Sequence, residues 1–185
     1  RRLEREERRR LEGTTAVEQV AGDLAVLQRG LDRRLGPGPG ITHVIASDCS
    51  CTRGLVRHLT DRGPSLGRRE SVLFVGASLP GLDGLEARGF DLHALAPEEL
   101  RTHFAIDGAP VLVVRDPDRI VYAGGYFDLP AAIHARDQRI VAAVDAGRPP
   151  ASLPLYGCAV STELARARDP LGLRALLRGL EIGTR

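Results

Sequence analysis

The order of apolar and polar positions along the chain predicts alternating strands and helices. Continuous apolar runs are typical of strands buried on both faces, and apolar residues at three- or four-residue steps are typical of helices packed on one face. Strands are expected at 41–46, 71–75, 90–95, 111–114 and 120–124. Helices are expected at 14–35, 53–62, 82–88, 96–104, 129–146 and 170–180.

This alternation predicts an α/β fold in which helices flank a central, mixed and mostly parallel sheet. The turn-rich link 115–119 joins the last two strands as a hairpin, which we expect to contribute one antiparallel edge. The Gly-Pro run 36–40 is the clearest linker. It separates an N-terminal helical extension (1–36) from a domain (41–147). A C-terminal extension (148–185), which carries Cys158, follows the domain.

The N-terminal helix carries a long apolar stripe, which should pack on the core or on a partner. If it were left bare we would expect a dimer, because exposed apolar patches of that size are rare on monomers. The stripe consists of Val17, Val20, Leu24, Leu27, Leu31 and Leu35.

Composition narrows the function classes. The net charge is only +2, and acidic and basic residues are interspersed, so we expect no nucleic-acid partner. No run approaches the roughly 18 apolar residues of a membrane span. The chain begins without Met, which is compatible with an anchor or signal removed from its start.

The chemistry is expected in the polar turn after the first strand, where Cys49 and Cys51 meet the start of a helix. Helix N–H groups and the positive end of the helix dipole favour a thiolate there. The chain has three cysteines, and this odd number argues against a purely structural disulfide framework. Nearby, Arg53 favours a thiolate and Asp48 opposes it, so the direction of the pKa shift stays open. Two ordinary loop thiols are the alternative.

The cysteine turn, together with Gly108-Ala109-Pro110 before a strand, resembles the thioredoxin-like superfamily over residues 41–147. The resemblance implies a cis Pro110 beside the cysteines, and Cys49, first in the turn and the more exposed position, as nucleophile. Residues 90–104 resemble the insertion of membrane-anchored thioredoxins of cytochrome maturation and of peroxiredoxins. From this likeness we expect an envelope-facing, formerly anchored protein; a cytoplasmic location stays open.

The chain also departs from the family pattern. The motif is Cys-x-Cys rather than Cys-x-x-Cys, the chain has no Trp, and His43 stands where the family often keeps a buried acid. The resemblance extends to a bacterial branch that has Cys-x-Cys and a later Cys in a Tyr-Gly-Cys setting, here Tyr156-Gly157-Cys158. A disulfide between Cys49 and Cys51 would close a small, strained ring, and strained disulfides are the more oxidising ones.

We therefore expect a thiol–disulfide oxidoreductase that acts on protein thiols or disulfides and needs no cofactor or resident metal. Cys158 should reach the cysteine turn, because functional loops gather at the carboxyl ends of parallel strands and the Pro-rich connector can return there. It would then act as the resolving thiol. One alternative is copper or zinc binding and delivery, with His43 or His58 completing the cysteine ligands. The other is a redox-inactive interaction module.

Overall fold

The computed structural model describes residues 23–47, 49–76, 79–128 and 135–160. In chain order its elements are α3 (Leu24–Leu35), β1 (Gly40–Ala46), α4 (Ser50–Arg62), β2 (Arg69–Val75), α5 (Leu82–Ala87), β3 (Asp91–Leu95), α6 (Pro97–Phe104), β4 (Gly108–Ala109), β5 (Val111–Arg115), β6 (Ile120–Gly124), α7 (Asp137–Asp145) and β7 (Cys158–Ala159). The expected strand and helix order is confirmed over these residues. The predicted final helix at 170–180 lies outside them.

Five strands form one mixed sheet in the order β3-β2-β1-β5-β6. Both β3 and β1 pair with β2 in parallel, whereas β5 is antiparallel to β1 and to β6. The expectation of a mixed sheet is confirmed. The hairpin β5–β6 lies at one edge of the sheet and contributes its antiparallel pairs, as expected. Its reversed strand is β5, inside the sheet, whereas the edge strand β6 points the same way as β1.

The path of the chain explains the reversal of β5. Strand β3 ends at Leu95 opposite Val75, at the carboxyl end of the parallel strands. Strand β5 starts at Val111 opposite Val44, near that same end of β1. The intervening α6 therefore moves the chain sideways across the sheet without returning it to the opposite end, and β5 must run backwards.

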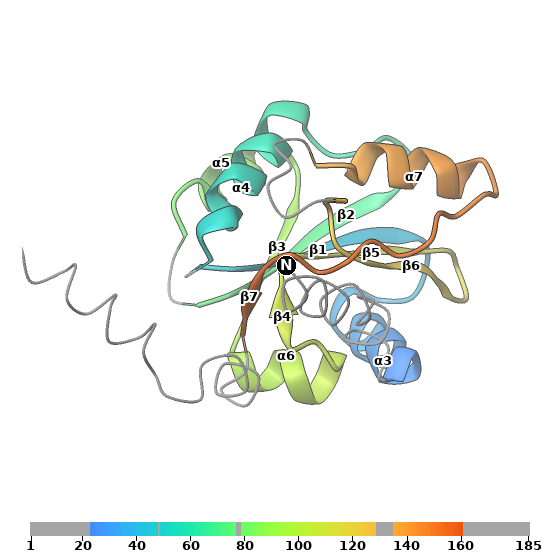
Figure 1. Ribbon diagram of the computed structural model, residues 1–185, viewed down its shortest axis with the longest axis horizontal. Helices are drawn as coiled ribbons and strands as arrows, with labels where there is room; N and C mark the ends of the chain where they lie inside the picture. The colour runs from blue at the N-terminus through green and yellow to red at the C-terminus, as the bar shows by residue number, and fades with distance from the viewer. Residues whose placement is uncertain (1–22, 48, 77–78, 129–134, 161–185) are drawn as a thin grey trace, which may run out of the picture.

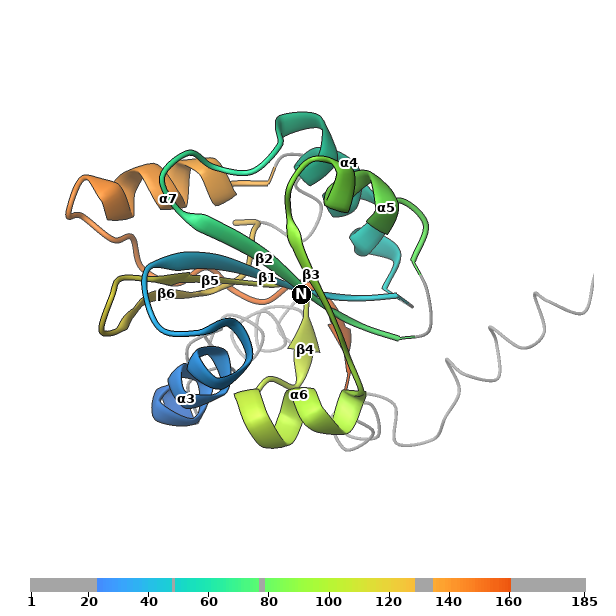
Figure 2. The same cartoon turned by 180° about the vertical axis from the view of Figure 1, so that it is seen from behind.

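Helices cover both faces of the sheet. Figure 1 shows α4, α5 and α7 on one side and α3 and α6 on the other, and Figure 2 shows the same layers from behind. Each layer has its own apolar core. Leu59 of α4 and Val144 of α7 pack with Ile45 on the first face, and Leu31 of α3 and Phe104 of α6 pack on the second.

The N-terminal helix is part of this second core. Asp23 caps α3 by accepting a hydrogen bond from the Val26 amide at 3.1 Å. Within the described residues Leu27, Leu31 and Leu35 of the apolar stripe are buried against the sheet and α6, and Leu24 is 42% exposed. The chain itself thus covers most of the described stripe. Val17 and Val20 lie outside the described residues.

Two differences from the expected elements fall near the C-terminus. The predicted helix 129–146 is wrong at its start, because residues 135 and 136 are not helical and α7 begins only at Asp137. The Asp137 side chain is buried and hydrogen-bonded to Arg62, which ties this point to α4. The short pair of strands β4 and β7, which joins Gly108–Ala109 to Cys158–Ala159, was not predicted.

Candidate active site

The cysteine turn connects the end of β1 to the start of α4. The turn is held by its backbone, since the Cys49 amide donates to Ala46 O at 3.2 Å and the Thr52 amide donates to Cys49 O at 3.0 Å. The Thr52 hydroxyl also donates to Ala46 O at 2.7 Å. Cys49 therefore stands as the residue before the first turn of α4, and Cys51 lies inside that turn.

The two thiols of the turn are in direct contact. Cys49 Sγ and Cys51 Sγ lie 2.7 Å apart, and both cysteines are free. Cys49 Sγ also lies 3.8 Å from the backbone oxygen of Ala109. Cys49 is thereby enclosed by Ala46 and Ala109, and only 3% of it is exposed.

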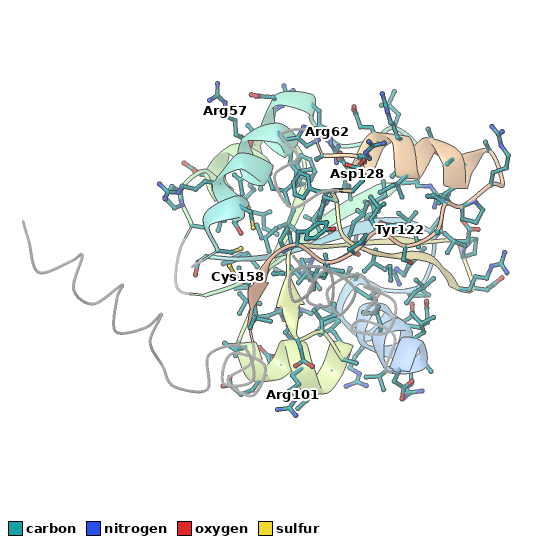
Figure 3. All side chains as sticks on the ribbon, viewed as in Figure 1. Arg57, Arg62, Arg101, Tyr122, Asp128 and Cys158 are labelled. Carbon is teal, nitrogen blue, oxygen red and sulfur yellow. The ribbon has the colours of Figure 1, made fainter. Side chains whose placement is uncertain are left out.

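The structure brings the remaining candidates, Pro110 and Cys158, to the same place. The Ala109–Pro110 bond is cis, as expected. Ala109 of β4 pairs with Cys158 of β7 in an antiparallel register, and Cys158 packs against the cluster that contains Cys49. Figure 3 shows Cys158 on β7 near the sulfur atoms at that end of the sheet. The expected proximity of Cys158 to the cysteine turn is confirmed.

This arrangement makes Cys49 the acidic thiol of the cluster. A hydrogen bond from the Cys51 thiol outweighs the effect of burial and lowers the pKa of Cys49 from its ordinary 9.0 to about 5. Hydrogen bonds from Cys158 and from the backbone N–H groups of Cys51 and Cys158 contribute to this lowering. The same hydrogen bond and burial raise the pKa of Cys51, so Cys49 holds the negative charge and Cys51 keeps the proton.

The structure revises two details of the sequence interpretation of this site. Cys49 was expected to be the more exposed thiol, but it is buried and Cys51 is half-buried, because β7 and β4 close over Cys49. The exposed Arg53 is not what lowers the pKa of Cys49, since the neighbouring thiols and backbone do so. Asp48 lies outside the described residues.

A second polar cluster, which sequence reasoning missed, lies beneath the other end of α4. His43 on β1 is fully buried, with Nδ1 2.5 Å from the Tyr126 hydroxyl oxygen and Nε2 2.5 Å from Glu70 Oε1. Arg62 donates to Glu70 and, through Nε at 2.8 Å, to Asp137 Oδ2. We call Tyr126, His43, Glu70, Arg62, Asp137 and His58 the buried network.

In the buried network, attraction between opposite charges outweighs the effect of burial on their pKa values. Burial alone raises the pKa of Glu70, but hydrogen bonds from His43 and Arg62 outweigh it and lower the pKa to about 2. Burial lowers the pKa of Arg62, and the attraction of Glu70 and Asp137 more than restores it. The only sequence signal was His43 within the predicted strand 41–46, because Glu70 lies before the strand predicted at 71–75 and the partners of both residues lie on other elements.

The two histidines considered as metal ligands are engaged elsewhere. His43 bonds to Tyr126 and Glu70, and His58 Nε2 lies 2.9 Å from Asp137 Oδ1. Among the described residues, no group of three or more His, Cys, Asp or Glu side chains is arranged to hold a metal ion. Across the same part of the chain, every helix is too short or too polar for a bilayer crossing.

Comparison with known proteins adds a likeness of fold and no named function. No protein-family model matches the chain, and no curated protein matches it. A hypothetical protein from Sinorhizobium meliloti, known from a crystal structure, has a TM-score of 0.52 and 18% identity, over 67% of this chain and 79% of its own. An uncharacterised conserved protein from Geobacillus kaustophilus has a TM-score of 0.48 and 19% identity, over 68% of this chain and 77% of its own. The first likeness supports an α/β fold with a mixed sheet flanked by helices.

Proposed function

We propose that the protein is a thiol–disulfide oxidoreductase with a thioredoxin-like fold, and that Cys49 is its nucleophile. The observation that carries the proposal is the contact of Cys49 with two further thiols, both of which lower its pKa. A lowered pKa supplies thiolate at neutral pH, and a neighbouring thiol can complete the exchange. The cis Pro110 beside the cysteines supports the assignment to the thioredoxin-like group.

The reaction needs no electron carrier. The Cys49 thiolate attacks one sulfur of a substrate disulfide, forms a mixed disulfide and expels the other sulfur as a thiolate, which takes a proton from water. A second thiol of the chain, Cys51 or Cys158, then loses its proton and attacks Cys49 Sγ. This step releases the substrate as a dithiol and leaves a disulfide in the protein. Two protein thiols are oxidised as one substrate disulfide is reduced, and the reverse sequence oxidises a dithiol.

Turnover of a peptide that contains one internal disulfide tests this function, with dithiothreitol as the reductant and metal removed by a chelator. We expect the wild-type protein to exceed the rate of dithiothreitol alone, and Cys49→Ser to abolish that excess. In a separate reaction without dithiothreitol, the double variant Cys51→Ser with Cys158→Ser should stop at the mixed disulfide, which non-reducing mass spectrometry detects. Gly54→Ala is the control, because its added Cβ meets nothing within 4 Å.

Two results would reject parts of this proposal. A wild-type protein that accelerates neither reduction of the disulfide peptide nor oxidation of the matching dithiol would reject the function and favour the redox-inactive interaction module. A Cys49→Ser variant as active as an active wild type would reject Cys49 as the nucleophile.

A further inference from the structure

We propose that residues 153–160, which we call the strap, occupy the substrate site of this chain, and that the substrate is an extended peptide segment with glycine directly before its cysteine. The proposal rests on the thiol–disulfide exchange proposed above and adds where the substrate binds and what it must contain. In this arrangement the strap has to leave before Cys49 can react, and an incoming segment takes its place.

The strap binds through its backbone as an added strand. Cys158 and Ala159 pair with Ala109 and Gly108, and the Val160 amide donates to Asp107 O at 2.8 Å. Pairing of this kind depends on main-chain groups, so another extended peptide can make the same hydrogen bonds. The short strand β4 therefore offers an edge that is occupied by the chain itself.

The strap also covers the nucleophile. Cys158 and Val160 pack on the cluster of Ala46, Cys49 and Ala109, and Cys49 is only 3% exposed. A disulfide needs an open approach to the attacking sulfur, roughly in line with the bond that breaks. With the strap in place Cys49 is acidic but enclosed, so displacement of the strap is a condition of the reaction.

The position before the cysteine admits only glycine. A Cβ added to Gly157 would lie 1.9 Å from the backbone oxygen of Ala109 and 2.8 Å from Pro110 Cδ. The obstructing atoms belong to the site rather than to the strap, and backbone cannot move aside as a flexible side chain can. Any segment that docks in the same register meets the same obstruction, so the site selects Gly-Cys.

This placement also separates the roles of the two further thiols. A docked substrate presents its cysteine where Cys158 now lies, so Cys158 and the substrate cannot face Cys49 together. Cys51 lies beside Cys49 in the first turn of α4 and is not part of the strap, so we expect it to stay there when the strap leaves. Cys51 therefore resolves the mixed disulfide, and Cys158 meets Cys49 only after the strap returns.

The first experiment measures access to Cys49. Reduced wild-type, Gly157→Ala and Gly54→Ala proteins are alkylated with iodoacetamide across a pH series, and the rate at Cys49 is followed by mass spectrometry with fragmentation. Rates are compared at their high-pH plateau, because loss of Cys158 from the cluster also changes the pKa of Cys49. We expect Gly157→Ala to raise the plateau rate at least tenfold and Gly54→Ala to leave it unchanged.

A second variant guards against misfolding. Val160→Asp places a charge in an apolar contact and close to Asp107, so it should release the strap and raise the alkylation rate to a similar degree. Circular dichroism checks that both variants stay folded. If a folded Gly157→Ala protein and a folded Val160→Asp protein both alkylate at the wild-type rate, the strap does not guard Cys49 and the proposal is overturned.

The second experiment measures selection. A blocked peptide of residues 155–160 and its Gly157→Ala counterpart are each activated at the cysteine as a mixed disulfide with 5-thio-2-nitrobenzoate. Attack of Cys49 on the peptide sulfur joins the peptide to the protein and releases the coloured thiolate. With the Gly157→Ala protein, whose strap is displaced, we expect the glycine peptide to react at least tenfold faster. Reaction of both peptides with glutathione provides the intrinsic comparison.

The outcomes distinguish this proposal from the function on which it rests. Equal rates for the two peptides overturn the Gly-Cys site while the exchange activity stands. If Cys49 becomes accessible in Gly157→Ala but the protein exchanges with no disulfide, the role of the strap is supported and the proposed function is rejected. Faster alkylation together with selection for the glycine peptide supports both.

Discussion

The two ends of α4 are built from opposite kinds of interaction. Its first turn carries Cys51, whose thiol donates a hydrogen bond to Cys49. Its last turn carries Arg62, which is buried between Glu70 and Asp137. At 1.5 Å per residue the two side chains start about 16 Å apart along the helix. Figure 3 shows Arg62 near α7, away from Cys158.

This difference between the two ends of α4 indicates that the fold is rigid at the Arg62 end and can open at the cysteine end. Removing one partner from a buried ion pair leaves an uncompensated charge and costs several kcal/mol, so the end at Arg62 cannot loosen without loss of stability. The cysteine end is covered by the strap, which pairs with β4 through main-chain groups that water can satisfy when the strap leaves. One helix therefore joins a fixed anchor to a reactive end that can be uncovered.

The largest effect is expected from breaking the ion pairs of Arg62 with Glu70 and Asp137, which we call the anchor. Arg62→Met keeps an apolar stem of similar length but leaves Glu70 and Asp137 buried without their cation, so we expect a loss of about 3–5 kcal/mol in the free energy of unfolding. Urea denaturation measures it. The matched control is Arg57→Met, whose arginine is 86% exposed in its side chain and 3.8 Å from Asp61; we expect a change below about 0.5 kcal/mol there. Equal changes in the two variants would contradict the comparison.

The next largest effect is expected from acid, which protonates Glu70 and so weakens the anchor. The pKa of Glu70 is about 2 in the folded protein and about 4.5 ordinarily, so its contribution to stability is fully present above about pH 4.5 and is lost as the pH falls towards 2. A shift of that size corresponds to about 3 kcal/mol. Unfolding free energies at a series of pH values should show a loss in this window that Glu70→Gln removes. Glu98→Gln, at an exposed position on α6, should retain it.

At the cysteine end, loss of the thiol partner should act on acidity rather than on the fold. In Cys51→Ala the main cause of the lowered pKa of Cys49 is gone, and burial remains to raise it. We expect the pH midpoint of thiolate ultraviolet absorbance to rise by at least one unit, which is a tenfold loss of thiolate below the midpoint. Cys158→Ala should shift it less. A larger shift in Cys158→Ala would reverse the order of the two partners.

The smallest effect is expected at the outer margin of the buried network. The His58 side chain is 33% exposed, and Asp137 keeps Arg62 when His58 is removed. His58→Ala should therefore cost less than about 1 kcal/mol. A double-mutant cycle with Asp137→Asn measures the coupling directly, and a coupling above that of Arg62 with Asp137 would place the anchor at His58 instead.

The sequence was informative where one local pattern decides the structure. The apolar runs gave the strands, and the placement of Cys49 and Cys51 before a helical pattern gave the thiol cluster. The pattern could not give the direction of β5, because that depends on the end of the sheet to which α6 delivers the chain. It could not give the buried network either, since His43 and Glu70 find their partners on other elements. Nor could it give the close approach of Gly157 to the backbone of Ala109, which joins residues distant in sequence.

The pairing of β7 with β4 also bears on the protein during its synthesis. The strap that covers Cys49 follows about fifty residues after the strand on which it docks. Since chains emerge N-terminus first, the strands of the sheet and the cysteine turn are synthesised before residues 153–160 exist to cover them. The nascent protein thus passes through a period in which Cys49 is open to cellular oxidants and to other thiols. Docking of the strap ends that exposure.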